Sequence, residues 1–125
     1  MKRISAHYIY FPSGETYKLH YAELDDNNCF KGVFPLEKEI SGTAFFTGIL
    51  ILLKEDISPS ILLNKLKELN KSYLDKTVFE LLDQLSFDKF KEEDTVFLYL
   101  LDGIDLLTTK LSTNNSSCNG YIQRL

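Results

Sequence analysis

The feature that most constrains the fold is an apolar run near the middle of the chain, AFFTGILILL at residues 44–53. This run is far shorter than the roughly 20 residues that a membrane-spanning helix needs. It is typical of a strand, and the consecutive residues Ile49, Leu50 and Ile51 predict burial on both faces of a sheet. Gly48 interrupts the run, and a glycine inside a strand often marks a bulge or the close approach of another backbone.

Further strands are predicted on both sides of this run. Residues 3–10 alternate with a period of two, which places one set on a common face: Ile4, Ala6, Tyr8 and Tyr10. Residues 17–24 alternate in the same way, and the DDNN turn at 25–28 leads into a returning strand at 29–34, so a hairpin is expected. Strand character returns at 95–101 and at 118–125, with a polar loop at 112–117 between them.

The period changes to that of a helix after residue 57. Ser58 is a suitable N-cap with Pro59 at the first helical position. One apolar stripe follows, made of Leu62, Leu66, Leu69 and Tyr73. A second helix is expected from Thr77, where TVFE fits a capping box, with a further set pointing inward: Val78, Leu81, Leu82 and Leu85. The chain is expected to be a single domain, residues 1–125, that is β-rich over 1–53, helical over 58–86 and β-rich over 95–125.

The composition disfavours several classes of function. The formal charge of −4 and the pI near 5.1 disfavour nucleic-acid binding, since the chain has no overall basic field. The apolar run is too short for a membrane span, and the N-terminus has no clean apolar stretch of a signal peptide, so a cytoplasmic protein is expected. Cys29 and Cys118 lack a CxxC pattern or a nearby histidine, which indicates two reduced thiols rather than a zinc site or redox pair.

Few residues indicate a catalytic, metal-binding or ligand-binding site. His7 and His20 fall on neighbouring predicted strands and could bind a metal with Glu23, but two partly exposed strand histidines are the simpler interpretation. No catalytic residue, metal ligand or cofactor site is predicted. Four of the seven tyrosines fall on the first two predicted strands, where an aromatic face could bind a ligand or pack a core. Gly48 likewise could mark a ligand groove or close packing.

Several segments resemble a known family. RISAHYIYFPSGE at 3–15, YKLHYAELDDNN at 17–28 and PLEKEISGTAFFTGIL at 35–50 are similar to the N-terminal segment of metal-dependent amidohydrolases, particularly bacterial ones. The final stretch, residues 95–125, resembles the C-terminal return of that family. In the family these segments form a small composite β-sandwich, which implies here an α+β fold: a small, mostly antiparallel sandwich or sheet formed by both chain ends, with two helices packed on it.

The resemblance does not extend to the catalytic part of the family. After residue 50 the chain continues as ILLKED, without the Pro-Gly-Phe and His-x-His sequences that open the catalytic barrel. A chain of 125 residues also cannot contain an eight-fold barrel of typical size. The resemblance therefore implies a module that has no catalytic activity and binds a protein partner or itself, with a full-length amidohydrolase as one such partner. Two alternatives stay open: a small-ligand-binding module using the tyrosine-rich strands, and a hydrolase with an unrecognised site.

Overall fold

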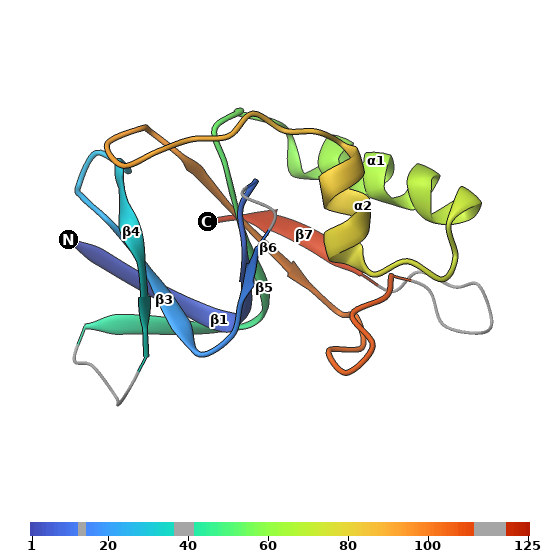
Figure 1. The fold of residues 1–125 in the computed structure, drawn as a ribbon, viewed down its shortest axis with the longest axis horizontal. Coiled ribbons are helices and arrows are strands. Elements are labelled where there is room, and N and C mark those ends of the chain that lie inside the picture. Colours follow the sequence, from blue (N-terminus) through green and yellow to red (C-terminus); the bar gives the residue numbers. More distant parts are fainter. Residues whose placement is uncertain (13–14, 37–41, 112–119) are drawn as a thin grey trace.

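The structure is a computed structural model that describes residues 1–12, 15–36, 42–111 and 120–125. One strongly bent β-sheet carries two helices against part of it (Figure 1). The strands are β1 Lys2–Tyr10, β2 Thr16–Tyr17, β3 His20–Leu24, β4 Phe30–Pro35, β5 Thr43–Leu53, β6 Phe97–Asp102 and β7 Tyr121–Arg124; the helices are α1 Pro59–Ser72 and α2 Val78–Gln84.

The strands lie in the order β4-β3-β1-β5-β6-β7, with the short β2 paired to β1. Every pair is antiparallel except β1 and β5, which run parallel. The predicted α+β class with a mostly antiparallel sheet is therefore confirmed. The strands form one continuous sheet, and the described ranges contain no second sheet stacked against it.

The end of β5 is the most deeply buried part of the sheet, as the apolar run predicts. Residues 49–53 are each 0% exposed. Because alternate side chains of a strand point to opposite faces, they enter two separate clusters. Ile49, Ile51 and Leu53 face the helices, whereas Leu50 and Leu52 face the opposite side of the sheet. Burial on both faces is thus confirmed.

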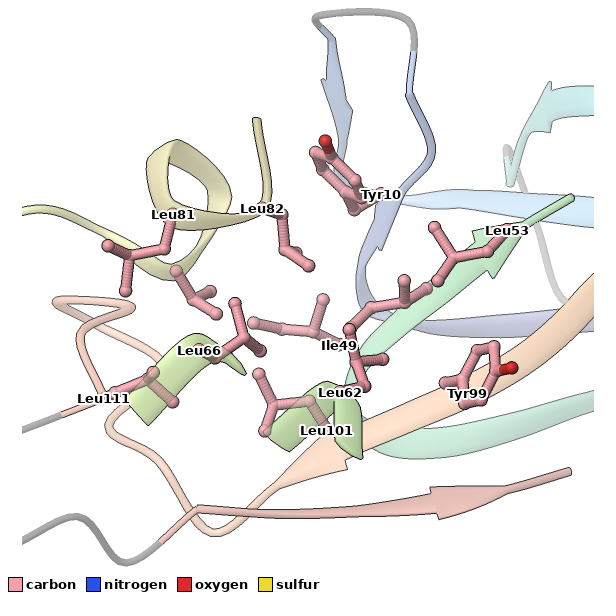
Figure 2. Packing of buried hydrophobic residues seen from close by; sticks show 12 residues of the cluster. Tyr10, Ile49, Leu53, Leu62, Leu66, Leu81, Leu82, Tyr99, Leu101 and Leu111 are labelled. Carbon is pink, nitrogen blue, oxygen red and sulfur yellow. The ribbon is translucent and has the colours of Figure 1, made fainter. Parts of the chain in front are cut away.

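The cluster on the helix side joins α1 and α2 to the sheet (Figure 2). We call it the helix-side cluster, and it consists of Tyr10, Ile49, Ile51, Leu53, Leu62, Leu66, Val78, Leu81, Leu82, Tyr99, Leu101 and Leu111. Burying one leucine-sized side chain contributes about 1.5–3 kcal/mol. The two helices are therefore held mainly by their apolar stripes, and the predicted inward residues Leu62, Leu66, Val78, Leu81 and Leu82 are fully buried.

The second cluster fills the concave side of the sheet. We call it the inner cluster, and it consists of Ile4, Ala6, Ile9, Ala22, Leu24, Phe30, Leu50, Leu52, Val96 and Leu98. Residues just before β6 close the space around it. The N–H of Phe30 donates to the Asp94 carbonyl at 2.9 Å, and the N–H of Val96 donates to the Asn28 carbonyl at 3.0 Å. The start of β4 thus meets the lead-in to β6, and the sheet curls into a partly closed barrel.

Gly48 is the point at which β5 changes direction. Its φ is +116°, and a Cβ atom placed on it would lie 2.4 Å from the carbonyl oxygen of Leu101 on β6. The pairing of β5 with β1 shifts register beside it. The bulge and the close approach of another backbone, both predicted from the glycine, are confirmed, and the space beside Gly48 is filled by packing.

The same register shift changes which face of the sheet the alternate side chains of β1 point to. It falls between Ala6 and Tyr8. Ile4 and Ala6 therefore point into the inner cluster, whereas Tyr10 belongs to the helix-side cluster and Tyr8 packs against it. The prediction that these four side chains share one face is wrong, because a period of two is broken wherever a strand pair contains a bulge. Ile9, the apolar residue on the other face of the predicted strand, is fully buried in the inner cluster.

The predicted strand at 17–24 is divided. β3 pairs with the first half of β1 and β2 with its end, in one shared register. The two residues between them, Lys18 and Leu19, leave the strand, and Leu19 has a φ of +55°. The prediction of one uninterrupted strand is therefore wrong at this point. The turn at 25–28 and the hairpin that it joins are confirmed by the antiparallel pair β3 and β4.

Both predicted helices are confirmed with their N-terminal caps. α1 follows Ser58 and has Pro59 in its first turn, although the Ser58 side chain makes no capping hydrogen bond. α2 begins with the predicted capping box, in which Thr77 Oγ1 accepts the N–H of Glu80 and the Glu80 carboxylate accepts the N–H of Thr77. Tyr73 departs from the predicted stripe, because it lies just beyond α1 and is exposed.

The C-terminal part returns to the sheet as β6 and β7. The predicted strand at 95–101 is confirmed with its start moved to residue 97, and the predicted terminal strand is observed at 121–124. The predicted polar loop at 112–117 and Cys118 lie outside the described residues. Within the described ranges, neither helix has the length and apolar character needed to cross a membrane.

We expect Gly48→Ala to lower the free energy of unfolding by about 3 kcal/mol, because the new Cβ meets backbone and the left-handed φ disfavours any side chain. Denaturant unfolding measures this. Gly42→Ala is the matched control, since Gly42 also has a positive φ but no atom of the described residues within 4 Å of the added Cβ. The control should lose only about 1 kcal/mol. Equal losses in the two variants would show that the close approach of Leu101 costs nothing.

Tyr10 links β1 to α2 at the border of the helix-side cluster. Its hydroxyl donates to Asp83 Oδ1 at 2.6 Å, and its ring is buried. Burial, followed by the hydrogen bond to Asp83 and the charge of that carboxylate, raises the pKa of Tyr10 far above its ordinary value near 10. Each of these effects disfavours the phenolate form.

We expect Tyr10→Phe to lower the free energy of unfolding by about 1 kcal/mol at pH 7, the usual contribution of one hydrogen bond. Because the folded-state pKa of Tyr10 is raised, its contribution is complete below about pH 10 and declines as the pH rises above that value. Denaturant unfolding between pH 7 and pH 11 should therefore show a steeper alkaline decline in the native protein than in the variant. Parallel declines would contradict this assignment.

Candidate binding site

The two histidines and Glu23 have separate partners. His7 lies on β1, and its Nδ1 accepts the N–H of Gly48 at 3.1 Å. The Nδ1–H of His20 donates to the Lys18 carbonyl at 2.6 Å. Glu23 pairs with Arg3 at 3.4 Å. Among the described residues, no three or more His, Cys, Asp or Glu side chains gather as a metal site.

Cys29 lies at the closure of the barrel. It forms an isolated bridge with Thr95, and its Sγ is 3.8 Å from the Thr95 hydroxyl. Its thiol is free and partly exposed in this structure. Cys118 falls outside the described residues, so the prediction of two reduced thiols stays a prediction for the pair.

The tyrosines of the first strands do not form a common face. Tyr8 donates its hydroxyl to the Leu106 carbonyl, and Tyr10 donates to Asp83. Tyr17 stacks on Phe11, while Tyr21 contacts Phe34. Tyr8 and Tyr10 both pack against Phe79 at the helix-side cluster, whereas Tyr17 and Tyr21 make their ring contacts elsewhere. Of the two cavities lined by residues of β1, one has Tyr8 in its lining, and neither has Tyr10, Tyr17 or Tyr21.

A pocket of about 410 Å³ lies beside residues 5–8 of β1, between the segment that connects β2 to β3 and the loop after β6. Its lining combines apolar side chains with His7, Tyr8 and Lys18. The apolar part includes Leu19, Leu36, Phe45, Leu106 and Leu107. Lys18 is the one lining residue with a fixed charge, and the described lining contains no carboxylate. The pocket therefore offers an apolar floor with a single cation beside it.

Three large apolar side chains stand exposed around this pocket, and we call them the apolar rim: Leu19, Phe45 and Leu107. Leu107 is 95% exposed, Leu19 75% and Phe45 58%. They come from three segments distant in sequence. Single exposed apolar residues are ordinary, but several that meet around one concavity are typical of a contact surface.

Hydrogen bonds hold the rim in place. The Leu19 carbonyl accepts the N–H of Leu36 at 2.7 Å, which anchors the interrupted segment to the end of β4. The N–H of Leu107 donates to Asp105 Oδ1 at 2.9 Å, and Tyr8 bonds the neighbouring Leu106 carbonyl at 3.1 Å. The segments that carry Leu19 and Leu107 are thus constrained by hydrogen bonds within the chain, and such constraint lowers the ordering cost of any contact made there.

Leu19 is unfavourable for stability in two ways. Its side chain is left in water, and its φ of +55° lies in the left-handed region, which costs a residue with a Cβ roughly 1–2 kcal/mol. Asparagine tolerates this conformation better, and glycine adopts it freely. The exposed Leu19 side chain adds little to the core, so Leu19 is a candidate for a contact at the surface.

The polar groups of the pocket are already engaged. The Nδ1 of His7 is occupied by Gly48, and its ring meets that of Phe45 edge to face, with centroids 5.4 Å apart. Lys18 Nζ lies over the Tyr8 ring, 5.1 Å from its centroid. These contacts orient the side chains but assemble no nucleophile with an adjacent base.

The sequence pattern did not predict this pocket. In the period-two pattern Leu19 falls on the same side as Tyr17 and Tyr21, which predicts a half-buried strand residue. The only available signal was the apolar dipeptide at 106–107, which follows a turn where exposed polar residues are more common. The rim depends on a tertiary arrangement that no local pattern encodes. Comparisons with protein-family models, curated proteins and solved structures find no match for the chain.

We expect Leu19→Asn to raise the free energy of unfolding by about 0.5–1 kcal/mol, since asparagine tolerates the left-handed backbone and is better solvated. Leu74→Asn is the matched control, because Leu74 is also exposed but lies outside the elements of the pocket and has no positive φ. Thermal or denaturant unfolding of both variants measures the difference. A loss of stability in Leu19→Asn would show that this leucine contributes to folding.

Proposed function

We propose that this chain is a non-catalytic protein-binding module and that the apolar rim is its contact surface. The observation that carries the proposal is Leu19, which is exposed and held at a positive φ at a cost in stability. Evolution commonly retains such a cost where a side chain serves function. Leu107 and Phe45 extend the same surface around a concave centre.

Three features support a protein rather than a small substrate as the ligand. The rim side chains project outward, so a flat or convex partner surface reaches them more readily than a molecule enclosed in the pocket. Apolar residues around a concavity with a polar surround resemble the centre of a protein interface. Two of the pocket's polar groups, the Nδ1 of His7 and the Tyr8 hydroxyl, are hydrogen-bonded within the chain.

A small-ligand-binding module is the second candidate. The pocket volume of about 410 Å³ lies in the range of known small-molecule sites, and its lining is mostly apolar. Such a ligand would contact His7, Tyr8 and Leu36 on the floor more than Leu107 at the rim. The two candidates therefore differ in how strongly they depend on the rim.

The resemblance to amidohydrolase segments bears on the partner. We propose that the partner is either a full-length amidohydrolase, a second copy or another protein of the cytoplasm. The sandwich relationship and the cytoplasmic location stay predictions from the sequence. The missing catalytic sequences after residue 50 support a module that assists another protein rather than one that carries out hydrolysis itself.

We expect Leu107→Ser to abolish or strongly reduce the capture of specific partners in affinity purification from the native cell, as truncating a central interface residue commonly costs at least about 2 kcal/mol. Leu74→Ser is the control, since Leu74 is 55% exposed but lies between α1 and α2. Mass spectrometry of the captured proteins gives the comparison. An unchanged partner set with Leu107→Ser would contradict the proposal and favour the small-ligand alternative.

A further inference from the structure

The bulge in β5 has a backbone N–H whose acceptor is a side chain. The pairing of β1 with β5 shifts register here, so that His7 alone stands opposite Thr47 and Gly48. In such a bulge the regular ladder of backbone hydrogen bonds is interrupted. The Gly48 N–H donates to Nδ1 of His7 at 3.1 Å. The imidazole ring thus does the work of a strand carbonyl at the point where β5 turns.

This hydrogen bond fixes which form of the His7 ring is present. A backbone N–H can only donate, so Nδ1 must accept, and an accepting Nδ1 carries no proton. The ring is then neutral, with its one N–H proton on Nε2. Once the ring takes up a second proton, both nitrogens are donors, and Nδ1 can no longer accept. Protonation of His7 and its hydrogen bond to Gly48 therefore exclude each other.

His20, the other of the two histidines in the chain, has the opposite chemistry. Its Nδ1 lies 2.6 Å from the Lys18 carbonyl oxygen, which can only accept, so this ring nitrogen donates. A protonated His20 ring keeps that donor and therefore keeps its hydrogen bond. The two histidines thus respond differently to acid, and His20 is a built-in comparison for His7.

The charged and titratable groups of the elements around the imidazole have other partners. Lys18, from the segment between β2 and β3, lies over the Tyr8 ring, and the Tyr8 hydroxyl donates to a carbonyl of the loop after β6. On β6, the Asp102 carboxylate accepts the next backbone N–H and a hydroxyl of β7. In the loop after β6, Asp105 accepts from its own loop. None of these groups bonds the Gly48 N–H, so none replaces the imidazole there.

The same ring supports one side of the apolar rim. It meets the Phe45 ring edge to face, with centroids 5.4 Å apart, and both residues line the pocket of about 410 Å³. The hydrogen bond to Gly48 holds the imidazole in the orientation that makes this contact. Losing the bond therefore removes a support of Phe45 as well as the acceptor at the bulge.

We propose that His7 is an acid-sensitive switch of the β5 bulge. In its neutral form the ring accepts the Gly48 N–H and supports Phe45. In its protonated form it releases both, so that the bulge opens locally and the apolar rim holds its partner less tightly. The effect on the partner rests on the proposed protein-binding function, whereas the response of Gly48 does not.

NMR of the whole chain, labelled with ¹⁵N and ¹³C, tests the switch between about pH 8 and pH 5, the range over which histidines usually titrate. The ring resonances of His7 report its tautomer and its protonation. The amide exchange of Gly48, corrected for the intrinsic effect of pH, reports the hydrogen bond. We expect Nδ1 to be unprotonated at pH 8, and the protection of Gly48 to fall about fivefold in step with protonation of the ring. The ring signals of Phe45 should change over the same range.

Two asparagine variants are the matched controls. In His7→Asn the side-chain Oδ1 is as many bonds from the backbone as Nδ1 and accepts an N–H at every pH, so Gly48 should stay protected at pH 5. His20→Asn should leave the response of Gly48 as it is in the native chain. Protonation of His7 without loss of protection at Gly48 would overturn the switch, as would the same loss in His7→Asn.

A capture experiment tests the consequence for the rim. Partners whose capture depends on Leu107 should be released from the native chain at about pH 5.5 and retained by His7→Asn, because the variant keeps its acceptor. Equal release from both chains would overturn the role of His7 at the rim, even where Gly48 responds. Absence of any partner that depends on Leu107 would contradict the proposed function instead, and the response of Gly48 would then decide the switch.

Discussion

The carbonyl oxygen of Leu101 occupies the space beside Gly48 that a side chain would otherwise fill. This contact allows β5 to turn between two sets of neighbours. Before the turn, β5 pairs with β1; after it, β5 lies between β1 and β6. The turn therefore divides the sheet into two halves that enclose the inner cluster. The core and the candidate site are consequences of the same backbone contact.

Local signals in the sequence predict those elements whose structure is decided locally. The apolar run predicts a strand that is buried on both faces, and the five consecutive side chains at the end of β5 are indeed fully buried. The α2 start is predicted by Thr77 and Glu80, which satisfy each other's backbone N–H groups. Gly48 likewise predicts the close approach of another strand, since only glycine leaves room for the neighbouring backbone.

Other features depend on contacts between distant segments. The turnover of β1 at His7 arises from a register shift against β5, so the period of residues 3–10 alone gives the wrong face for Tyr8. Leu19 fits the alternating pattern of a strand. In the structure, however, the backbone at Lys18 and Leu19 leaves the strand, and the Leu19 side chain is exposed to solvent. The pocket combines this opening with Leu107 from the loop after β6, nearly ninety residues later. The periodicity of the sequence cannot predict this contact between two distant segments.

The site also shows how rigidity and exposure are combined. Backbone hydrogen bonds to Leu36 and Asp105 fix the segments that carry Leu19 and Leu107, although the side chains themselves make few contacts. Lys18 and Lys2 are supported in a similar way, by an aromatic ring and by a neutral amide. Attachment to neutral groups holds each ammonium in place without cancelling its charge.

The closure of the barrel has a consequence for the order of folding. Cys29 and Thr95, which lie opposite each other at the closure, are 66 residues apart in sequence. Bringing such distant segments together costs chain entropy that a single short pairing offsets poorly. The strands between them reduce that cost once they have paired, because they hold the two segments close. We therefore expect β4 and the lead-in to β6 to pair late, so that Phe30 and Val96 join the inner cluster after the strands between them have formed.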